Sequence, residues 1–311
     1  MKNNQNFGTT TSITTSYAGE FAGKYIAAAL LSAKTLDDRA ITIVPNVKFK
    51  QVMKKVATAG IIQDATCDFS ATGSVTLTER ILEPKELQVN LELCKKDFRS
   101  DWEAAQMGFS VYDNLPANFT DFLLAQVAAK VGEATEQAIW SVSASGSGNF
   151  TGLLNLITAG GSGAVSGSAS GSITSANVVN ALDSLVTAVP NAVYGKEDLV
   201  IYIPTNVAKA YQQALGANYA NGYNNQVLVG QKPFDYNGIP MQVCPGMPSS
   251  YMVAAQKSNL FFGTGLMSDS QEVKVLDMGD LDGSQNVRII MRYTAGVQFG
   301  IGSDIAVHKG A

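Results

Sequence analysis

Residues 74–93 have the sequence SVTLTERILEPKELQVNLEL, in which apolar and polar side chains alternate on both sides of a single proline, Pro84. A period of two places successive side chains on opposite faces of a β-strand, so the runs 75–81 and 87–93 each predict a strand with one polar face. Pro84 marks the break between them, because proline has no amide proton to give to a sheet. We expect residues 41–93 to form an extended, half-exposed antiparallel ribbon. Such a ribbon needs a surface to lie on, and a neighbouring subunit would supply one.

A long helix is predicted over residues 118–142. Its apolar residues recur at intervals of three and four, as on one face of an α-helix. They are Leu124, Val127, Val131, Ala134 and Ala138. Asn118 supplies an N-cap after Pro116. At a rise of 1.5 Å per residue the helix would be about 37 Å long, roughly twice the average length, which favours a structural spine.

The rest of the chain divides at residues 143–172, which are rich in Gly and Ser around an apolar island at 150–157. This composition predicts two flexible loops around a packed segment, and a boundary between domains. Beyond it we expect a compact unit with a helix over 173–189, a buried strand over 198–203 and a helix over 204–215.

Less regular segments flank these elements. Residues 1–15 predict a mobile polar arm anchored by a short Ala/Leu helix over 25–31, and residues 216–225 predict an exposed loop. Short strands are expected over 241–244, 251–255, 260–262, 272–276, 287–293 and 297–301. The predicted fold class is therefore α+β.

Charge is scarce in this chain. Asp, Glu, Lys and Arg make up 15% of its 311 residues, against about 25% in an average soluble protein. Interface cores are depleted of charge, so an obligate assembly explains the composition, and a charge-poor extracellular protein is the alternative. The formal net charge of −4 lacks the basic footprint of a sequence-specific nucleic-acid binder and leaves room only for loose contact with DNA.

Residues 1–17 are polar and lack the basic start and apolar run of a secretion signal, so we expect no export. No stretch reaches the 18 or so apolar residues that span a bilayer, so no membrane segment is expected. Cys67, Cys94 and Cys244 are odd in number and far apart, which favours buried free thiols over disulfides or a zinc site.

Sequence patterns that carry chemistry are missing. The single histidine, His308, is expected in a frayed tail, which excludes paired-histidine zinc motifs and weakens Ser-His or Cys-His catalysis. No nucleophile elbow or phosphate-binding loop occurs, and the Gly-rich run 160–171 is expected to be a linker. Asp277, Asp280 and Asp282 lack calcium-loop spacing and are expected in a turn between strands.

Charged residues that cluster along the sequence are expected to be solvated helix or strand-edge charges. They include Asp97, Asp101, Glu103, Glu133 and Glu136, near Lys95, Lys96, Arg99 and Lys130. We therefore expect no catalytic, cofactor or metal site, and no enzyme.

Four stretches, together with the order of the predicted elements, carry a resemblance to a known family. They are Phe150-Thr-Gly-Leu-Leu154, Asp198-Leu-Val-Ile-Tyr-Ile-Pro204 with Tyr211-Gln-Gln-Ala-Leu215, Ser258-Asn-Leu-Phe-Phe-Gly-Thr-Gly-Leu266, and Arg292-Tyr-Thr-Ala-Gly-Val-Gln-Phe-Gly300. In that order they resemble the Gly-Leu turn after the spine helix, the central strand and helix, the Asn-Leu-x-x-Gly-Thr turn and the closing hairpin of the Hong Kong 97-type capsid fold. The resemblance extends from about residue 20 to the end of the chain.

The resemblance implies a major capsid protein of a tailed double-stranded DNA bacteriophage, located in the virion capsid and assembled in the host cytoplasm. It implies the following parts: an N-terminal arm and short helix over 1–40, an extended loop over 41–93, a peripheral domain over 94–172 with its spine helix at 118–142, an axial domain over 173–270, and closing strands over 271–311. Members of the family form the hexamers and pentamers of an icosahedral shell.

The partners that this resemblance implies are further copies of the chain, contacted through the arm and the loop. A separate scaffolding protein, a portal protein and packaged DNA held by non-specific contact are also implied. Some relatives cross-link the loop covalently through lysine, and Lys48, Lys50, Lys54 and Lys55 lie in the loop here. We expect non-covalent locking.

Three alternatives stay open. A bacterial nanocompartment shell has the same fold, although its usual N-terminal Leu/Arg/Pro-containing cargo segment has no counterpart in the polar arm. An extracellular adhesin or surface-layer module would share the low charge and would consist largely of strands. An enzyme of unrecognised type would need a pocket with convergent polar groups of perturbed pKa.

Overall fold

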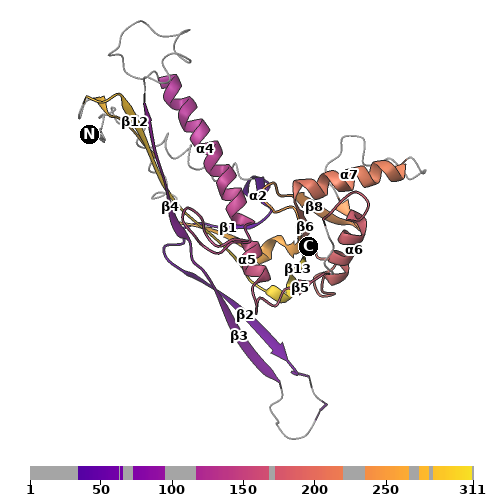
Figure 1. Cartoon of the computed structure of the whole chain (residues 1–311). Coiled ribbons are helices and arrows are strands. Elements are labelled where there is room, and N and C mark those ends of the chain that lie inside the picture. Colours follow the sequence, from indigo (N-terminus) through magenta and orange to yellow (C-terminus); the bar gives the residue numbers. More distant parts are fainter. Residues whose placement is uncertain are drawn as a thin grey trace, which may run out of the picture.

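The computed structural model describes residues 34–62, 64–65, 73–94, 117–167, 172–219, 235–265, 273–279 and 283–309. The arm predicted over 1–15, the helix predicted over 25–31 and most of the loop predicted over 216–225 lie outside these residues. Within them, two units lie side by side and a two-stranded ribbon projects from the body (Figure 1). The predicted α+β class is confirmed.

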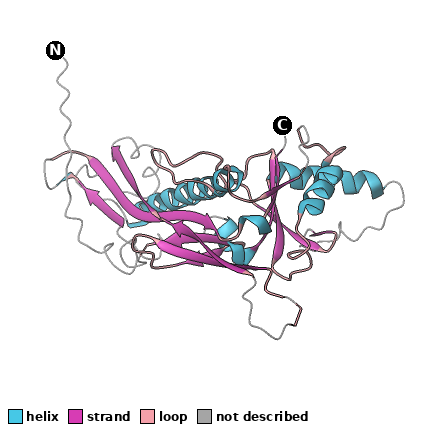
Figure 2. Cartoon of the chain, turned by 90° about the horizontal axis from the view of Figure 1, so that it is seen from below, coloured by secondary structure: helices cyan, strands magenta, loops and turns pink. Residues whose placement is uncertain are grey.

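The first unit is a five-stranded sheet with a long helix along it. Its strands are β1 (Thr42–Val44), β10 (Leu260–Thr264), β12 (Asn286–Phe299), β11 (Val273–Asp277) and β4 (Lys85–Cys94). The long strand β12 is central: β4 pairs with one of its edges, β10 and β11 pair with the other, and all three are antiparallel to it. β1 extends the sheet by pairing with β10 in parallel. Figure 2 shows the long helix alongside these strands.

That helix, α4 (Ala117–Ile139), matches the helix predicted over 118–142. Leu124, Val127 and Val131 are buried in the core against the sheet, as their spacing predicts. Ala134 is exposed, and the neighbouring Thr135 is buried in its place. The hydroxyl of Thr135 donates to the carbonyl of Val131 over 2.7 Å, so this buried polar group has a partner within the helix.

The second unit is a six-stranded sheet with two helices. In spatial order its strands are β5 (Val165–Ser166), β13 (Ala306–Lys309), β9 (Tyr251–Gln256), β6 (Leu199–Ile203), β8 (Ile239–Val243) and β7 (Asp235–Tyr236). Helices α6 (Val178–Ala188) and α7 (Thr205–Tyr219) pack with Leu199, Ile201 and Ile203 on one face of β6. Val200 and Tyr202 face the core of the first unit. Because β6 is buried on both faces, its sequence is apolar throughout instead of alternating.

Short elements join the two units. They are α2 (Lys34–Asp37), α5 (Leu153–Thr158), and the 3₁₀ turns η2 (Lys257–Asn259) and η4 (Gly302–Asp304). α5 lies in the apolar island predicted at 150–157, and its Leu153, Leu154 and Ile157 are buried. No helix among the described residues is long and apolar enough to cross a membrane.

The ribbon is shorter than the span predicted over 41–93. It consists of β2 (Gln51–Ala59) paired antiparallel with β3 (Ser74–Leu82). The second alternating run does form a strand, β4, but β4 pairs with β12 and belongs to the body. Alternation predicts a half-exposed strand and says nothing about its partner, which here lies about 200 residues further along the chain.

The end of the chain also differs from the expectation of two strands over 287–293 and 297–301. Residues 286–299 form the single strand β12, so the stretch 292–300 is no hairpin. Gly296 lies inside this strand because the β3–β4 corner crosses it closely. A Cβ at Gly296 would lie 2.9 Å from both the Glu83 carbonyl oxygen and the Pro84 Cα.

Candidate assembly surfaces

The ribbon has two unlike faces. Directly opposed residues of an antiparallel pair project to the same face, and the register opposes Val52 to Ile81 and Val56 to Leu77. Val75 shares this face, two residues before Leu77. The exposed fractions of the five side chains are 45% for Val52, 61% for Val56, 64% for Val75, 62% for Leu77 and 44% for Ile81. We call these five side chains the apolar face of the ribbon.

An apolar face that projects into solvent marks a surface for association. Burying the exposed remainder of its five aliphatic side chains would contribute on the order of 5 kcal/mol per copy, before the costs of association. The loop after β2 continues the exposed apolar surface with Ile61 and Ile62, which are 59% and 91% exposed.

One charged pair interrupts the apolar face. Lys54 and Glu79 are directly opposed in the register, between the Val52–Ile81 and Val56–Leu77 pairs. A charge in the middle of an exposed strand discourages indiscriminate pairing with other strands. A surface that binds this face must also offer a polar group opposite Lys54 and Glu79.

The root of the ribbon is fixed to the body through β3. The Arg80 guanidinium lies 4.0 Å from the centre of the Phe299 ring and donates to the Ser162 carbonyl over 3.0 Å. Gln298 donates its side-chain amide to the Ile81 carbonyl over 2.8 Å. Leu82 is fully buried. A partly desolvated cation–π contact of this kind contributes about 1 kcal/mol.

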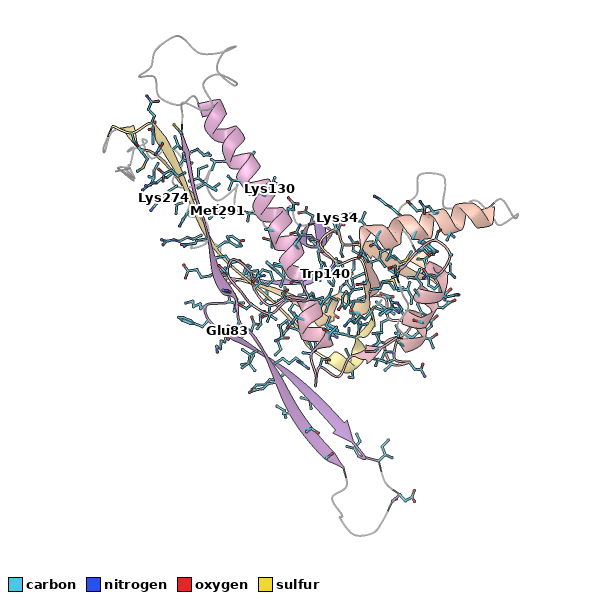
Figure 3. All side chains as sticks on the ribbon, viewed as in Figure 1. Lys34, Glu83, Lys130, Trp140, Lys274 and Met291 are labelled. Carbon is cyan, nitrogen blue, oxygen red and sulfur yellow. The ribbon has the colours of Figure 1, made fainter. Side chains whose placement is uncertain are left out.

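A salt bridge joins the residues that flank the two strands at the root. Lys50 and Glu83 lie 3.0 Å apart, and both side chains are more than half exposed. Glu83 marks this root in Figure 3. Exposed ion pairs contribute about 0–1 kcal/mol, so the contacts of Arg80 and Leu82 dominate here.

A second polar cluster lies where the two units meet, around Glu136 of α4. The backbone amide and hydroxyl of Thr35 donate to the two oxygens of the Glu136 carboxylate over 2.9 Å and 2.6 Å. Trp140 donates its indole N–H to the Thr35 hydroxyl oxygen over 2.8 Å. The Trp140 ring also lies 5.1 Å from that of Tyr202 in the second sheet (Figure 3 labels Trp140). We call this cluster the Glu136 clasp.

The prediction that Glu136 is a solvated helix charge is wrong, because the side chain is 5% exposed. Burial raises the pKa of Glu136 above its usual 4.5, although its hydrogen bonds from Thr35 and Gly246 act in the opposite direction. Glu133, one turn away, is the solvated charge that was expected, and it forms an exposed ion pair with Lys130. Asp97, Asp101 and Glu103 lie outside the described residues.

The clasp holds the segment that leads in from the N-terminus. Tyr202 donates its hydroxyl to the Ala40 carbonyl over 2.5 Å, and Gln242 donates to the Asp38 carboxylate over 2.5 Å. Residues 34–40 are therefore bonded both to α4 and to the second sheet. Beside the clasp is a pocket of about 340 Å³. It is lined by Lys34, Ala129, Gly132, Glu133, Glu136, Gln137, Pro245 and Gly246.

His308 does not lie in a frayed tail, as predicted, but in β13. The side chain is fully buried, and its Nδ1 lies 3.1 Å from the Ser184 hydroxyl of α6. Burial lowers the pKa of His308 below its usual 6.5. Terminal position suggested fraying, whereas β13 is enclosed because it pairs with β9 and β5 and packs beside α6.

Other residues singled out in the sequence have structural places. Cys244 is free and buried, as predicted, Cys94 is free and partly buried, and Cys67 lies outside the described residues. Asp277 is buried at the end of β11 and accepts the amide of Gly279 over 3.0 Å, as in a turn. Within the described part of the chain, no three His, Cys, Asp or Glu side chains gather as they would around a metal ion.

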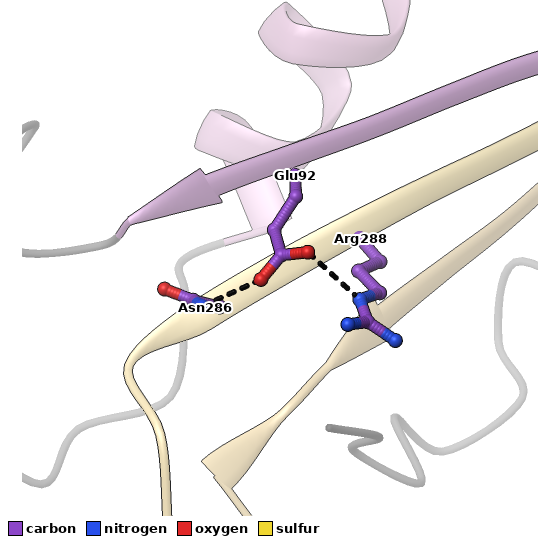
Figure 4. Close-up of polar contacts among 3 residues, drawn as sticks. All are labelled: Glu92, Asn286 and Arg288. Carbon is purple, nitrogen blue, oxygen red and sulfur yellow. Dashed lines mark hydrogen bonds and ion pairs between the residues drawn. The ribbon is translucent and has the colours of Figure 1, made fainter. Parts of the chain in front are cut away.

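The far end of the first sheet carries an exposed polar network (Figure 4). Glu92 on β4 accepts from Asn286 over 2.6 Å and from the Nε of Arg288 over 3.1 Å. Arg288 and Glu92 are directly opposed across the two strands. This cross-strand pair adds to the pairing of β4 with β12 at a distance from the ribbon.

No family model and no curated protein matches this sequence. Solved structures do match in fold. A chain of the capsid of the native GTA particle aligns with a TM-score of 0.60 at 16% identity, over 91% of this chain and 90% of that chain. A chain of the satellite phage P4 procapsid that includes the size determination (Sid) protein aligns with a TM-score of 0.57 at 14% identity, over 98% and 93%.

The capsid of Myoviridae phage XM1 aligns with a TM-score of 0.54 at 14% identity, over 89% of this chain and 92% of that chain. This chain has the fold of a phage capsid protein. The agreement spans almost the full length of both chains, so the capsid fold includes both sheets and the long helix. The α+β class and the capsid fold expected from the resemblance are confirmed.

Proposed function

We propose that this protein is the major capsid protein of a tailed double-stranded DNA bacteriophage. In this role the chain assembles with itself into the hexamers and pentamers of an icosahedral shell that encloses DNA. The observation that supports it best is the capsid fold, which covers about nine-tenths of this chain and of the capsid chains that match it. The role is structural and not enzymatic.

The division of the chain into capsid domains is part of this proposal. The parts are an arm and short helix over 1–40, an extended loop over 41–93 whose flanking strands β1 and β4 join the first sheet, a peripheral domain over 94–172, an axial domain over 173–270 and closing strands over 271–311. The β2–β3 ribbon is the core of the extended loop, α4 is the spine of the peripheral domain, and the sheet around β6 with α6 and α7 is the axial domain.

The ribbon is the contact between neighbours in this proposal. Its apolar face has more than two-fifths of every side chain in solvent, and among the described residues the contacts of Arg80 and Ile81 tie the ribbon to the body at its root. An isolated two-stranded ribbon is marginally stable in water, so it gains most from lying on a second copy. The scarcity of charge in the chain agrees with surfaces that neighbours cover.

Further partners follow from the same role. A portal protein closes one vertex, a separate scaffolding protein guides assembly, and packaged DNA is held by non-specific contact, which the net charge of −4 keeps weak. The assembled protein resides in the virion capsid, and assembly takes place in the host cytoplasm.

Electron microscopy and size-exclusion chromatography of the full chain, expressed alone and with its scaffolding protein, test the proposal. We expect closed shells or their hexameric and pentameric units. A monomer that stays monomeric at every concentration, with and without scaffold, would overturn it.

A matched pair of substitutions tests the role of the ribbon. Leu77→Asp places a charge on the apolar face, whereas Thr76→Asp places the same charge on the adjacent residue of the opposite face. We expect Leu77→Asp to raise the concentration needed for assembly at least tenfold and Thr76→Asp to leave it within about twofold, since one buried unpaired charge costs several kcal/mol. Equal effects of the two variants would contradict an apolar contact.

A further inference from the structure

The contacts at the root of the ribbon differ in what they control. Leu82 is buried at the end of β3, and the salt bridge of Lys50 with Glu83 joins the residues that flank the two strands at the base of the ribbon. Arg80 makes two contacts in different directions, one to the ring of Phe299 and one to the carbonyl of Ser162. Two divergent contacts from one planar group restrict rotation as well as position.

Arg80 also lies on the face of the ribbon from which it can hold the ribbon against the body. In the register Arg80 is opposed to Met53, and both lie on the face opposite to Val52, Leu77 and Ile81. When the guanidinium is seated against the body, the apolar face is therefore turned outward. The side that anchors the ribbon and the side that is free to bind are fixed by the same strand alternation.

A small change in the direction of the ribbon at its root displaces its far end considerably, because the ribbon is long. At about 3.3 Å per residue, residue 74 lies about 23 Å from residue 81, and a tilt of about 10° at the root moves residue 74 by about 4 Å. That displacement approaches the distance of about 4.8 Å between neighbouring strands. It would carry Val75 and Leu77 off their places on a receiving surface.

We propose that Arg80 is a positioning residue that sets the direction of the ribbon, through its paired contacts with Phe299 and Ser162, and so presents the apolar face to a second copy of this chain. Presentation of the apolar face to a second copy rests on the proposed function, whereas the role of Arg80 in setting the direction of the ribbon does not. In the free subunit Arg80 holds the ribbon in one direction before any neighbour is present.

Distances between spin labels in the full chain test this inference. Nitroxide-bearing amino acids replace Thr76 on the ribbon and Thr187 on α6, both exposed, and labelled protein is diluted into an excess of unlabelled protein so that only distances within one chain are measured. With Arg80 present we expect one narrow distance distribution. Arg80→Met keeps a long apolar stem but loses the contacts of the guanidinium with Phe299 and Ser162, and it should widen the distance distribution at least twofold. Arg80→Lys should give a width between those of the parent chain and Arg80→Met.

Arg288→Met is the matched control, because it removes the same guanidinium group from β12 of the first sheet, at the Glu92 network and away from the ribbon. It should leave the distribution as narrow as in the parent chain. Thermal unfolding verifies that each variant is folded. If Arg80→Met fails to fold, Gln298→Leu, which removes the bond to the Ile81 carbonyl, takes its place and should widen the distribution to a smaller extent.

A distribution that stays narrow in Arg80→Met, or that widens equally in Arg288→Met, would overturn the inference. Assembly is measured separately in the same samples. A parent chain that never assembles would contradict the proposed function while the distances still decide the role of Arg80. Slower assembly of a folded Arg80→Met chain with a widened distribution is the result expected if both are right.

Discussion

Glu136 and His308 are buried ionisable side chains, one in the clasp where the two units meet and one in the last strand, β13. Burial favours the neutral form of each, which raises the pKa of the acid and lowers the pKa of the base. His308 therefore lowers the free energy of unfolding as pH falls, whereas Glu136 lowers it as pH rises.

For His308 we expect stability to fall with acid. Its folded-state pKa is lowered, so its contribution is complete above the usual pKa of 6.5 and is lost as pH falls through the folded-state value. His308→Asn does not titrate and is the reference. Urea unfolding from about pH 7.5 to about pH 5.5 should show the parent chain losing stability against this variant by up to about 1.4 kcal/mol per pH unit. Parallel curves would show that the histidine charges freely in the folded chain.

For Glu136 we expect the opposite pH dependence, with stability falling as pH rises. Its folded-state pKa is raised, so its contribution is complete below the usual 4.5 and is lost as pH rises through the folded-state value. We expect the stability difference between the parent chain and Glu136→Gln to shrink as pH rises above 4.5. Glu136→Ala should be less stable by about 3 kcal/mol at neutral pH, because the two donors of Thr35 lose their acceptor. A constant difference across pH, measured by urea unfolding, would contradict this account.

At the scale of elements, strands and helices were predictable wherever their own sequence carries a period. The alternation at 75–81 predicted β3 and three of the five residues of the apolar face, and the three-four spacing predicted α4. Val52 and Val56 of β2 are four residues apart with Lys54 and Lys55 between them, and this weaker pattern did not by itself predict a strand. The clasp was missed because Glu136 looks like any helix carboxylate until Thr35, about 100 residues earlier, is placed against it.

Partners of elements were not predictable for the same reason. Leu87 and Val89 face the core of a sheet that β12 completes, and no local pattern links the two segments. The break expected near Gly296 was wrong because the glycine serves a close approach and not a turn. Local sequence determines the faces of an element, and long-range packing determines what covers them.

The junction between α4 and α5 gives a test at this scale. A Cβ at Gly152 would lie 2.2 Å from the Ser141 carbonyl oxygen and 2.8 Å from that of Ala138, both backbone atoms. We expect Gly152→Ala to destabilise the chain by about 3 kcal/mol, since the two helices must separate. Gly160→Ala is the control, because a Cβ there has open space, and it should be neutral or slightly stabilising. Thermal unfolding that fails to separate the two variants would mean that the junction yields easily.

The whole molecule combines a body that is well packed with a projection that is not. Both sheets contribute to one continuous core, in which Tyr202 and Val253 of the second sheet meet Trp140 and Phe262. The ribbon leaves the body at the buried Leu82 and carries its aliphatic side chains into solvent. The ribbon of such a subunit presents an exposed apolar face that a second copy can cover.

If apolar burial drives assembly, salts should act on the shell in a particular way. Sodium chloride at about 1 M shortens the Debye length to about 3 Å and weakens exposed ion pairs, so an ionic shell would fall apart. We expect this shell to persist, because the apolar face of the ribbon carries only one charged pair. Ammonium sulfate, which strengthens apolar burial, should lower the concentration required for assembly in the parent chain but not rescue Leu77→Asp fully. Light scattering at several salt concentrations measures both effects, and dissolution of shells by sodium chloride would show that ionic contacts, and not the ribbon, hold the neighbours together.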